Sequence, residues 1–369
     1  MSRTGVRVIA VLPVLLLELG MPLAAERSVA RDALVNNGWY QQDGRVIWGL
    51  YHSSSIWGGL RTPEPQWYST GKVGGPNITR RDPTRVGPLL TENLDALSDS
   101  LKRYGFPGLE HHYGLWYDRR RDAHDLGARK DAAVVGPFLE MPWARSDVPG
   151  AADGLYKYDL TRFNPWYFER LREFARLSDA KGLVFRHNFY MQHMLLESRA
   201  HFEDFPWRPF NTIQDTGLPD TTPTANAFYD VSHPVRRDLH RRYIRKCLDE
   251  LGGFRNVVFS LSQEYTGPKA FVEFWLDVIR QWQDDQGHQG KTVRRVHISL
   301  GATKDVTDAI LSDATRAPLI GTIDLRRWWY DRDGTLIAPQ GGRLTVQAQG
   351  GEKHSTKLAY LTITAVATP

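Results

Sequence analysis

One carboxylate, Glu264, stands where enzymes built on parallel sheets keep their catalytic groups. Residues 257–261 form an apolar, partly β-branched run of strand length, which is typical of a strand buried on both faces. The run then changes abruptly to a polar segment, residues 262–266, and closes with Gly267-Pro268. Catalytic groups of α/β enzymes lie just beyond the carboxyl ends of such strands, so Glu264 is the first candidate for acid/base chemistry. Capping of the following helix is the structural alternative.

Polar and aromatic side chains also follow other predicted strands. The strand at 46–52 ends at His52, and the strand at 318–324 ends at Asp324, with Trp328 and Trp329 shortly after it. Two further strands end in groups of the same kind. The strand at 106–112 leads to Glu110, His111, His112, Tyr113 and Trp116. The strand at 183–188 ends in Arg186, His187 and Asn188. Carboxyl ends of parallel strands share one edge of a sheet, so these side chains are expected to gather there.

Carboxylates combined with aromatic rings are typical of glycoside hydrolysis. Two carboxyl groups flank the bond, one protonating the leaving oxygen and the other acting as nucleophile or base. We predict Glu264 as the acid/base, Asp324 as its partner and Glu110 as the second candidate partner; their separation, and therefore retention or inversion, stays open. The predicted substrate-binding residues are hydrogen-bonding groups and stacking platforms, namely His52, His112, Arg186, His187, Asn188, Gln263, Tyr265, Trp116, Trp328 and Trp329.

Metal and cofactor chemistry receive less support. Neighbouring side chains on a strand point to opposite faces, so the adjacent His111 and His112 are poorly placed to bind one metal. A metal-dependent hydrolase that uses His187, His193 and a carboxylate is a separate hypothesis. No glycine-rich phosphate loop follows any strand, which argues against nucleotide-binding folds. We therefore predict no cofactor and no metal.

The predicted elements alternate between strand and helix. Helix signals include the Asn164-Pro165 start, Pro234 at the head of a helix, and an amphipathic pattern over 271–282. Six strands result, at 46–52, 106–112, 183–188, 256–262, 295–300 and 318–324. Alternation of this kind calls for a parallel sheet. We predict an α/β fold of the (β/α)8 TIM-barrel type, incomplete because a closed barrel needs eight strands.

Composition and the N-terminus limit the class of protein. The net charge is +5, from 47 basic and 42 acidic residues that are interspersed, so nucleic-acid binding is not favoured. With one cysteine, Cys247, no intrachain disulfide can form. Residues 1–30 resemble an export signal: Arg3 and Arg7 precede a short apolar run, and a small-x-small site follows at 28–30. We expect a secreted or periplasmic protein with no stable membrane span after cleavage, while a buried N-terminal helix is the alternative.

The chain divides into a signal at 1–30, a barrel at 31–340 and an atypical tail at 341–369. From Gly341 onward, Trp and Asp are absent and Thr, Gln, Lys and Ala are frequent. Two weakly alternating segments, 344–348 and 358–366, predict a hairpin. Either the tail supplies irregular closing strands, or the natural barrel continues and this chain ends in foreign sequence; the second interpretation is favoured.

Several separate segments resemble a family of exported bacterial proteins of unassigned function with a glycoside-hydrolase-like (β/α)8 barrel. These are Phe228-Tyr-Asp-Val with His233-Pro-Val-Arg-Arg, Ser262-Gln-Glu-Tyr-Thr-Gly-Pro, Ala302-Thr-Lys-Asp-Val and Ala338-Pro-Gln-Gly-Gly. The resemblance covers about residues 35–342 and implies carbohydrate chemistry. Glu264 also resembles the acid/base of the large retaining glycosidase clan, although Gln263 stands where that clan has Asn and no seventh strand carries a nucleophile. The expected partner is a carbohydrate, with a non-catalytic sugar-binding barrel or an inactive truncated chain as alternatives.

Overall fold

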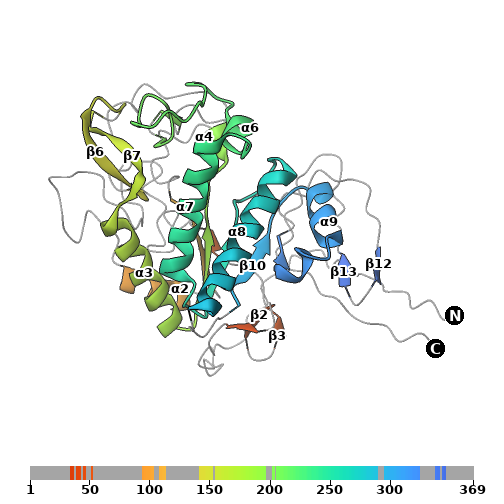
Figure 1. Cartoon of the computed structure of the whole chain (residues 1–369). Helices are drawn as coiled ribbons and strands as arrows, with labels where there is room; N and C mark the ends of the chain where they lie inside the picture. Colours follow the sequence, from red (N-terminus) through yellow and green to blue (C-terminus); the bar gives the residue numbers. More distant parts are fainter. Residues whose placement is uncertain are drawn as a thin grey trace, which may run out of the picture.

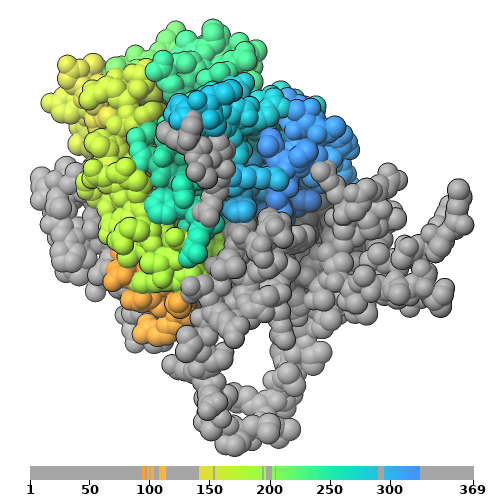
Figure 2. Space-filling view, turned by 60° about the horizontal axis from the view of Figure 1, so that its bottom comes forward, coloured from red at the N-terminus to blue at the C-terminus, as the bar shows by residue number. Residues whose placement is uncertain are grey.

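The computed structural model describes residues 34–36, 39–42, 45–46, 51–52, 94–103, 108–113, 141–152, 154–196, 202–203, 205–289, 295–324, 337–340 and 343–345. Figure 1 shows the helices and strands of these residues, and Figure 2 shows that the described residues between 141 and 324 pack into one continuous body.

A six-stranded sheet forms the centre of the described part of the chain. Its strands are β4 (Tyr51–His52), β5 (Gly108–His111), β8 (Val184–Asn188), β9 (Val257–Ser260), β10 (His297–Leu300) and β11 (Ile320–Ile323). They lie side by side in sequence order, and every neighbouring pair is parallel. A fold class of α/β with consecutive parallel strands is thus confirmed, whereas closure into an eight-stranded barrel is not shown by the described residues.

The connections between these strands carry the helices expected from the sequence. The helices are α2 (Leu94–Arg103), α3 (Pro165–Ala180), α7 (Pro234–Leu251), α8 (Lys269–His288) and α9 (Lys304–Ser312), with the short α4 (His193–Leu196) and α6 (Ala225–Phe228) and a 3-10 turn at Ala317–Leu319. Asn164 caps α3 by accepting a hydrogen bond from the Trp166 N–H, and proline takes the first turn of both α3 and α7. The predicted helix starts at 164–165 and 234 are confirmed.

Helices α3, α7 and α8 cover one face of the sheet (Figure 1). Each presents an apolar stripe, with Leu171 and Phe174 on α3, Tyr243 and Cys247 on α7, and Trp275 on α8 completely or almost completely buried. These side chains pack against the apolar face of the strands, so the main hydrophobic core lies between the sheet and these helices.

The N-terminal strands differ from the prediction. One strand was expected at 46–52, but β3 (Arg45–Val46) pairs antiparallel with β2 (Trp39–Gln42), while Tyr51–His52 belongs to the parallel sheet. Strand β2 also pairs with β1 (Leu34–Asn36). The residues that connect these strands in the chain are Asn37-Gly38 and Asp43-Gly44, the dipeptides favoured in two-residue hairpins. The single strand predicted at 46–52 is therefore wrong, because its two ends belong to different sheets.

Two antiparallel pairs lie outside the parallel sheet. Strand β12 (Ile337–Gln340) pairs with β13 (Arg343–Thr345), so the start of the tail pairs with the residues before it. The predicted hairpin partner, 358–366, lies outside the described residues. The second pair, β6 (Trp143–Pro149) with β7 (Tyr156–Phe163), was not predicted.

The β6–β7 hairpin is held against the loop that follows α4. The Tyr158 N–H donates to the Asn211 carbonyl at 2.7 Å, and the Ile213 N–H donates to the Tyr158 carbonyl at 3.0 Å. Trp143 at the start of β6 and Trp207 in the loop are both buried, with ring centroids 5.8 Å apart and an interplanar angle of 80°. Figure 1 places the hairpin beside α4 and α6, at the end of the molecule where α7 begins.

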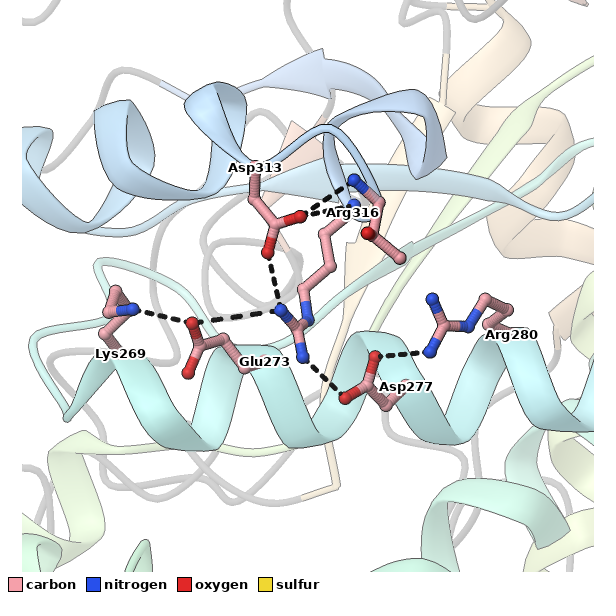
Figure 3. A network of polar contacts seen from close by, with 7 residues as sticks. Lys269, Glu273, Asp277, Arg280, Asp313 and Arg316 are labelled. Atoms are coloured by element: carbon pink, nitrogen blue, oxygen red, sulfur yellow. Dashed lines mark hydrogen bonds and ion pairs between the residues drawn. The ribbon is translucent and has the colours of Figure 1, made fainter.

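A network of charged side chains joins α8 to the segment after α9 (Figure 3). Arg316 lies between two acids, with its Nη2 2.7 Å from Asp277 Oδ2 and its Nη1 2.5 Å from Asp313 Oδ2. These hydrogen-bonded carboxylates raise the pKa of Arg316, and the Arg316 hydrogen bond is the main reason that the pKa of Asp313 is lowered. The network fixes the entry into β11, the strand that leads to Asp324.

Within the described ranges, no helix is long and apolar enough to span a membrane.

Candidate functional site

Side-chain alternation along β8 separates the predicted site residues into two groups. Arg186 contacts Glu110 and Ser260, which lie on the neighbouring strands β5 and β9. Phe185 instead packs on Phe174 of α3, with ring centroids 5.4 Å apart. Successive strand residues point to opposite faces, so Arg186 and Asn188 share the face turned away from the helices. We call this the inner face of the sheet.

A buried charge cluster occupies the inner face. The Arg186 Nη2 lies 2.8 Å from Asp324 Oδ2, and the Nε lies 3.3 Å from Glu110 Oε1. Asn188 donates a hydrogen bond from Nδ2 to the same Glu110 oxygen at 2.9 Å. All four residues are at most 6% exposed. The structure therefore brings together four predicted site residues from β5, β8 and the end of β11.

Small polar side chains complete the inner face. Backbone register aligns Asn188 with Ser260, Ser260 with Ser299, and Ser299 with Thr322, so these four point to one side. Ser260 accepts a hydrogen bond from Arg186 Nη2 at 2.9 Å. Asn188 Oδ1 and Thr322 Oγ1 are buried oxygens with no hydrogen-bond partner among the described residues. Each can accept a hydrogen bond, as the hydroxyl groups of a ligand would require.

His187 lies on the opposite face, among the helices. Its ring is fully buried and packs edge-on against Phe189 and Phe259, with centroids 5.3 and 6.3 Å away. Burial lowers the pKa of His187 to about 3, so this ring is neutral at physiological pH. The structure therefore does not bring His187 to the carboxylates, because it follows Arg186 by one residue on a strand.

His111 shares this environment. Its ring stacks on His187 at 6.1 Å, and its Nε2 lies 3.3 Å from the Tyr167 hydroxyl of α3. Burial lowers the pKa of His111 well below its usual range, with a further contribution from His187. Both histidines are thus neutral core residues on the helix side of the sheet.

Glu264 stands out by its backbone. Among the described residues it is the one non-glycine with a positive φ, at 49°, while Gly150, Gly154, Gly182 and Gly217 hold the other positive values. A residue with a Cβ in this region carries strain of about 1 to 3 kcal/mol, and such strain clusters at functional sites. Glu264 is partly buried just beyond the carboxyl end of β9, in agreement with its predicted position.

The residues after Glu264 fold back tightly. Tyr265 is 1% exposed, and its hydroxyl donates to the Pro268 carbonyl at 3.0 Å. A Cβ on Gly267 would lie 2.4 Å from the Tyr265 hydroxyl oxygen and 2.5 Å from the ring carbon that carries it. Glycine at position 267 is therefore needed for the close approach of the tyrosine, and Tyr265 supports the segment rather than presenting its hydroxyl to solvent.

Replacing Gly267 with alanine is expected to destabilise the protein by about 1 to 3 kcal/mol, because the new methyl group overlaps a buried ring. The measurement is the urea unfolding midpoint. Gly253→Ala is the matched control, because a Cβ there would have no atom within 4 Å. Equal midpoints for the two variants would contradict the tight fold of this segment.

The other predicted residues fall into two sets. Gln263 and His112 are buried, at 4% and 5% exposed, near the carboxyl ends of β9 and β5. Backbone register aligns His52 with Glu110, although the His52 side chain is outside what the structure describes. Three predicted stacking residues also lie outside the described residues, namely Trp116, Trp328 and Trp329.

The described side chains contain no group of three or more His, Cys, Asp or Glu residues that could hold a metal ion. Sequence reasoning missed Ser260, which interrupts an otherwise apolar run and whose hydroxyl marks the inward face of β9. It also left out Gln192, whose contacts with Glu264 join residues 72 positions apart. No local pattern in the sequence signals such a contact.

Comparisons with known proteins give a family and two distant structural likenesses. A candidate glycoside hydrolase from Bacteroides vulgatus is 12% identical with a TM-score of 0.31, covering 76% of this chain and 40% of that one. A family 5 glycoside hydrolase from the same organism is 7% identical with a TM-score of 0.32, covering 73% and 39%. This chain thus spans about 40% of the length of either protein. No curated protein shows significant similarity.

The family match covers residues 16–362. It continues past Gly341, where the sequence resemblance was expected to stop, and takes in most of the segment set apart as a tail. The match spans far more than half of the chain, and the chain belongs to the family described as a domain of unknown function, DUF6298.

Proposed function

We propose that this protein hydrolyses glycosidic bonds of an oligosaccharide or polysaccharide, with Glu264 as general acid/base and Asp324 as the partner carboxylate. The observation that carries the proposal is the placement of these two residues beyond the carboxyl ends of β9 and β11, on either side of β10. The carboxyl ends of parallel strands are the edge at which α/β enzymes place their chemistry.

Backbone hydrogen bonds support this placement. The Tyr265 N–H donates to the Gly301 carbonyl at 2.9 Å, and the Asp324 N–H donates to the Leu300 carbonyl at 2.8 Å. Glu264 and Asp324 thus flank the end of β10 at nearly the same height. Two strand spacings amount to about 10 Å. Side chains that lean toward each other from such positions reach the separations of about 5 to 9.5 Å found in glycosidases.

Gly301 lies between the two acids. A Cβ at this position would be 3.1 Å from the Asp324 Cβ and 3.3 Å from its Oδ2, closer than most side chains tolerate. The absence of a side chain on Gly301 leaves room for the Asp324 carboxylate. This supports a site in which a substrate group enters between Glu264 and Asp324.

Arg186 orients the partner carboxylate. A charge-assisted hydrogen bond at 2.8 Å fixes one oxygen of Asp324, and the same guanidinium group contacts Glu110. Glu110 is therefore the second candidate partner. The buried oxygens Asn188 Oδ1 and Thr322 Oγ1 on the same inner face support a ligand rich in hydroxyl groups.

Replacing Glu264 with glutamine tests the proposal. We expect the release of reducing ends from the best substrate in a panel of plant and microbial polysaccharides to fall by about 10² to 10⁴, the usual contribution of a general acid or base. Binding to the same polysaccharide, measured by affinity electrophoresis, should persist because glutamine keeps the shape of the side chain.

Glu169→Gln is the matched control, because Glu169 is an exposed residue of α3. Its activity should equal that of the wild type. Hydrolysis that survives Glu264→Gln unchanged would exclude Glu264 as the acid/base.

A sugar-binding protein without catalysis is the alternative, favoured by the engagement of both Glu110 and Asp324 with Arg186. In that case Glu264→Gln and the wild type would bind the polysaccharide equally and neither would release sugar. The signal-like residues 1–30 support export of the protein to the periplasm or the medium in either case. N-terminal sequencing of the secreted protein would test this part of the proposal.

A further inference from the structure

Gln192 connects the end of β8 to the segment that carries Glu264. The residue lies four positions after β8 and is 1% exposed. Its side-chain oxygen accepts a hydrogen bond from the Thr266 N–H at 2.9 Å, and its side-chain nitrogen donates to the Glu264 carbonyl. The Gln192 backbone N–H also donates to the Ser262 hydroxyl at 3.3 Å. One buried side chain thus contacts the backbone of the strained residue itself and of the residue two positions after it.

The chemistry of the two backbone groups fixes the orientation of this amide. A backbone N–H can only donate and a backbone carbonyl can only accept. The Thr266 N–H therefore requires the Gln192 oxygen, and the Glu264 carbonyl requires the Gln192 nitrogen. Among uncharged side chains of this length, only a primary amide supplies both groups from one planar end.

A further hydrogen bond holds the same segment at Tyr265, the residue between Glu264 and Thr266. The Tyr265 N–H donates to the Gly301 carbonyl at 2.9 Å. The end of β10 therefore holds the same backbone segment that Gln192 holds from the end of β8. The left-handed backbone of Glu264 is unfavourable for a residue with a Cβ and persists only when its surroundings impose it. The Gln192 amide supplies part of that constraint at the carbonyl of Glu264 itself.

We infer that Gln192 is a positioning residue: its amide holds the left-handed backbone of Glu264 and thereby directs the Glu264 carboxyl group toward the substrate. This inference rests on the proposed function, in which Glu264 is the acid/base. The contacts of Gln192 with this segment are to backbone groups of Glu264 and Thr266. Its effect passes entirely through the backbone of residues 264–266.

Gln192→Glu tests the inference with almost no change in side-chain volume. A carboxylate keeps the acceptor for Thr266 but loses the donor to the Glu264 carbonyl, and two oxygens then face each other. We expect kcat to fall about 10- to 100-fold, as for small misplacements of a catalytic group, with KM close to the wild-type value. A protonated carboxyl group has both a donor and an acceptor, so kcat relative to wild type should recover as the pH is lowered toward 4.5.

Amide hydrogen exchange supplies a readout that needs no activity. The Thr266 N–H is held by Gln192, so its exchange in Gln192→Glu should speed up by about tenfold or more at pH 7.5. The matched control is Gln214→Glu. Gln214 accepts from the Leu160 N–H and donates to Asp159, each at 2.8 Å, but contacts β7 instead of the Glu264 segment. This control should leave kcat and the Thr266 exchange rate unchanged.

The outcomes separate the two proposals. A wild-type kcat in Gln192→Glu, or a loss no greater than in Gln214→Glu, would overturn the positioning role. If the wild type hydrolyses no polysaccharide, the proposed function fails. The exchange rate of Thr266 then decides alone whether Gln192 holds the Glu264 backbone, and an unchanged rate would refute that.

Discussion

Replacing Arg186 with methionine is expected to lower the free energy of unfolding by about 3 to 5 kcal/mol, the usual cost of removing one partner from a buried ion pair. The guanidinium group contacts Glu110 and Asp324, and all three side chains are at most 7% exposed. Methionine fills a similar volume but leaves two buried carboxylates without this cation. Urea denaturation followed by tryptophan fluorescence measures the loss.

A matched substitution separates burial from charge. Arg242 makes an ion pair of similar length with Asp238, at 2.6 Å, but both side chains are more than half exposed. Arg242→Met should change the unfolding free energy by less than about 1 kcal/mol, as is usual for surface pairs. A triple variant, Arg186→Met with Glu110→Gln and Asp324→Asn, removes all three charges. It should recover most of the unfolding free energy that Arg186→Met loses. A loss below about 1 kcal/mol in Arg186→Met alone would contradict the cluster.

Acid is expected to destabilise the protein strongly between about pH 6.5 and pH 3, because buried histidines must remain neutral in the folded state. Burial lowers the pKa of both His187 and His240 to about 3, and lowers that of His111 well below its usual range. In the unfolded chain these rings bind protons near pH 6.5. The contribution of these rings to the free energy of unfolding is therefore complete above pH 6.5. It decreases as the pH falls, by up to about 1.4 kcal/mol per pH unit for each ring.

Replacing His187 with leucine isolates one of these contributions. Neither ring nitrogen of His187 has a hydrogen-bond partner among the described residues, so an apolar side chain fits this position. The variant should unfold at a similar urea concentration at pH 7.5 and at a higher one than the wild type at pH 4.5. His288→Leu, at the exposed end of α8, is the control and should keep the wild-type pH dependence. If the urea midpoints of His187→Leu and the wild type changed equally between pH 7.5 and pH 4.5, this would contradict a neutral, buried His187.

Hydrophobic runs and helix signals were sufficient to locate most of the parallel sheet. Each of the six strands of the parallel sheet lies within a predicted one. Short apolar runs such as Leu183–Phe185 and Val257–Phe259 mark several of these strands, as expected for strands buried on both faces. The Asn164-Pro165 and Pro234 starts were equally clear, since caps act within a few residues. The antiparallel β6–β7 pair escaped prediction because its strands carry charged residues at several positions, such as Arg145, Asp147 and Arg162.

The sequence predicted several residues that meet at one end of the sheet, but only part of their geometry. Arg186, Asn188, Glu110 and Asp324 were all expected at one end of the sheet, and the structure joins them by direct contacts. His187 was grouped with them, although alternation along a strand turns it to the helix face. The Gln192 contact depends on two strands lying side by side, so it required the fold itself.

The two tryptophans that close the β6–β7 hairpin onto the following loop form an optical reporter. Their ring centroids are 5.8 Å apart, the rings are nearly perpendicular, and both are buried. Buried aromatic rings that are held in fixed packing contribute to the near-ultraviolet circular dichroism of a protein. Because Trp143 and Trp207 come from different segments, we expect their contribution to be lost when the hairpin separates from the loop, even while the helices keep their far-ultraviolet spectrum. The protein can therefore report the detachment of one substructure in its own absorption band, without any added label.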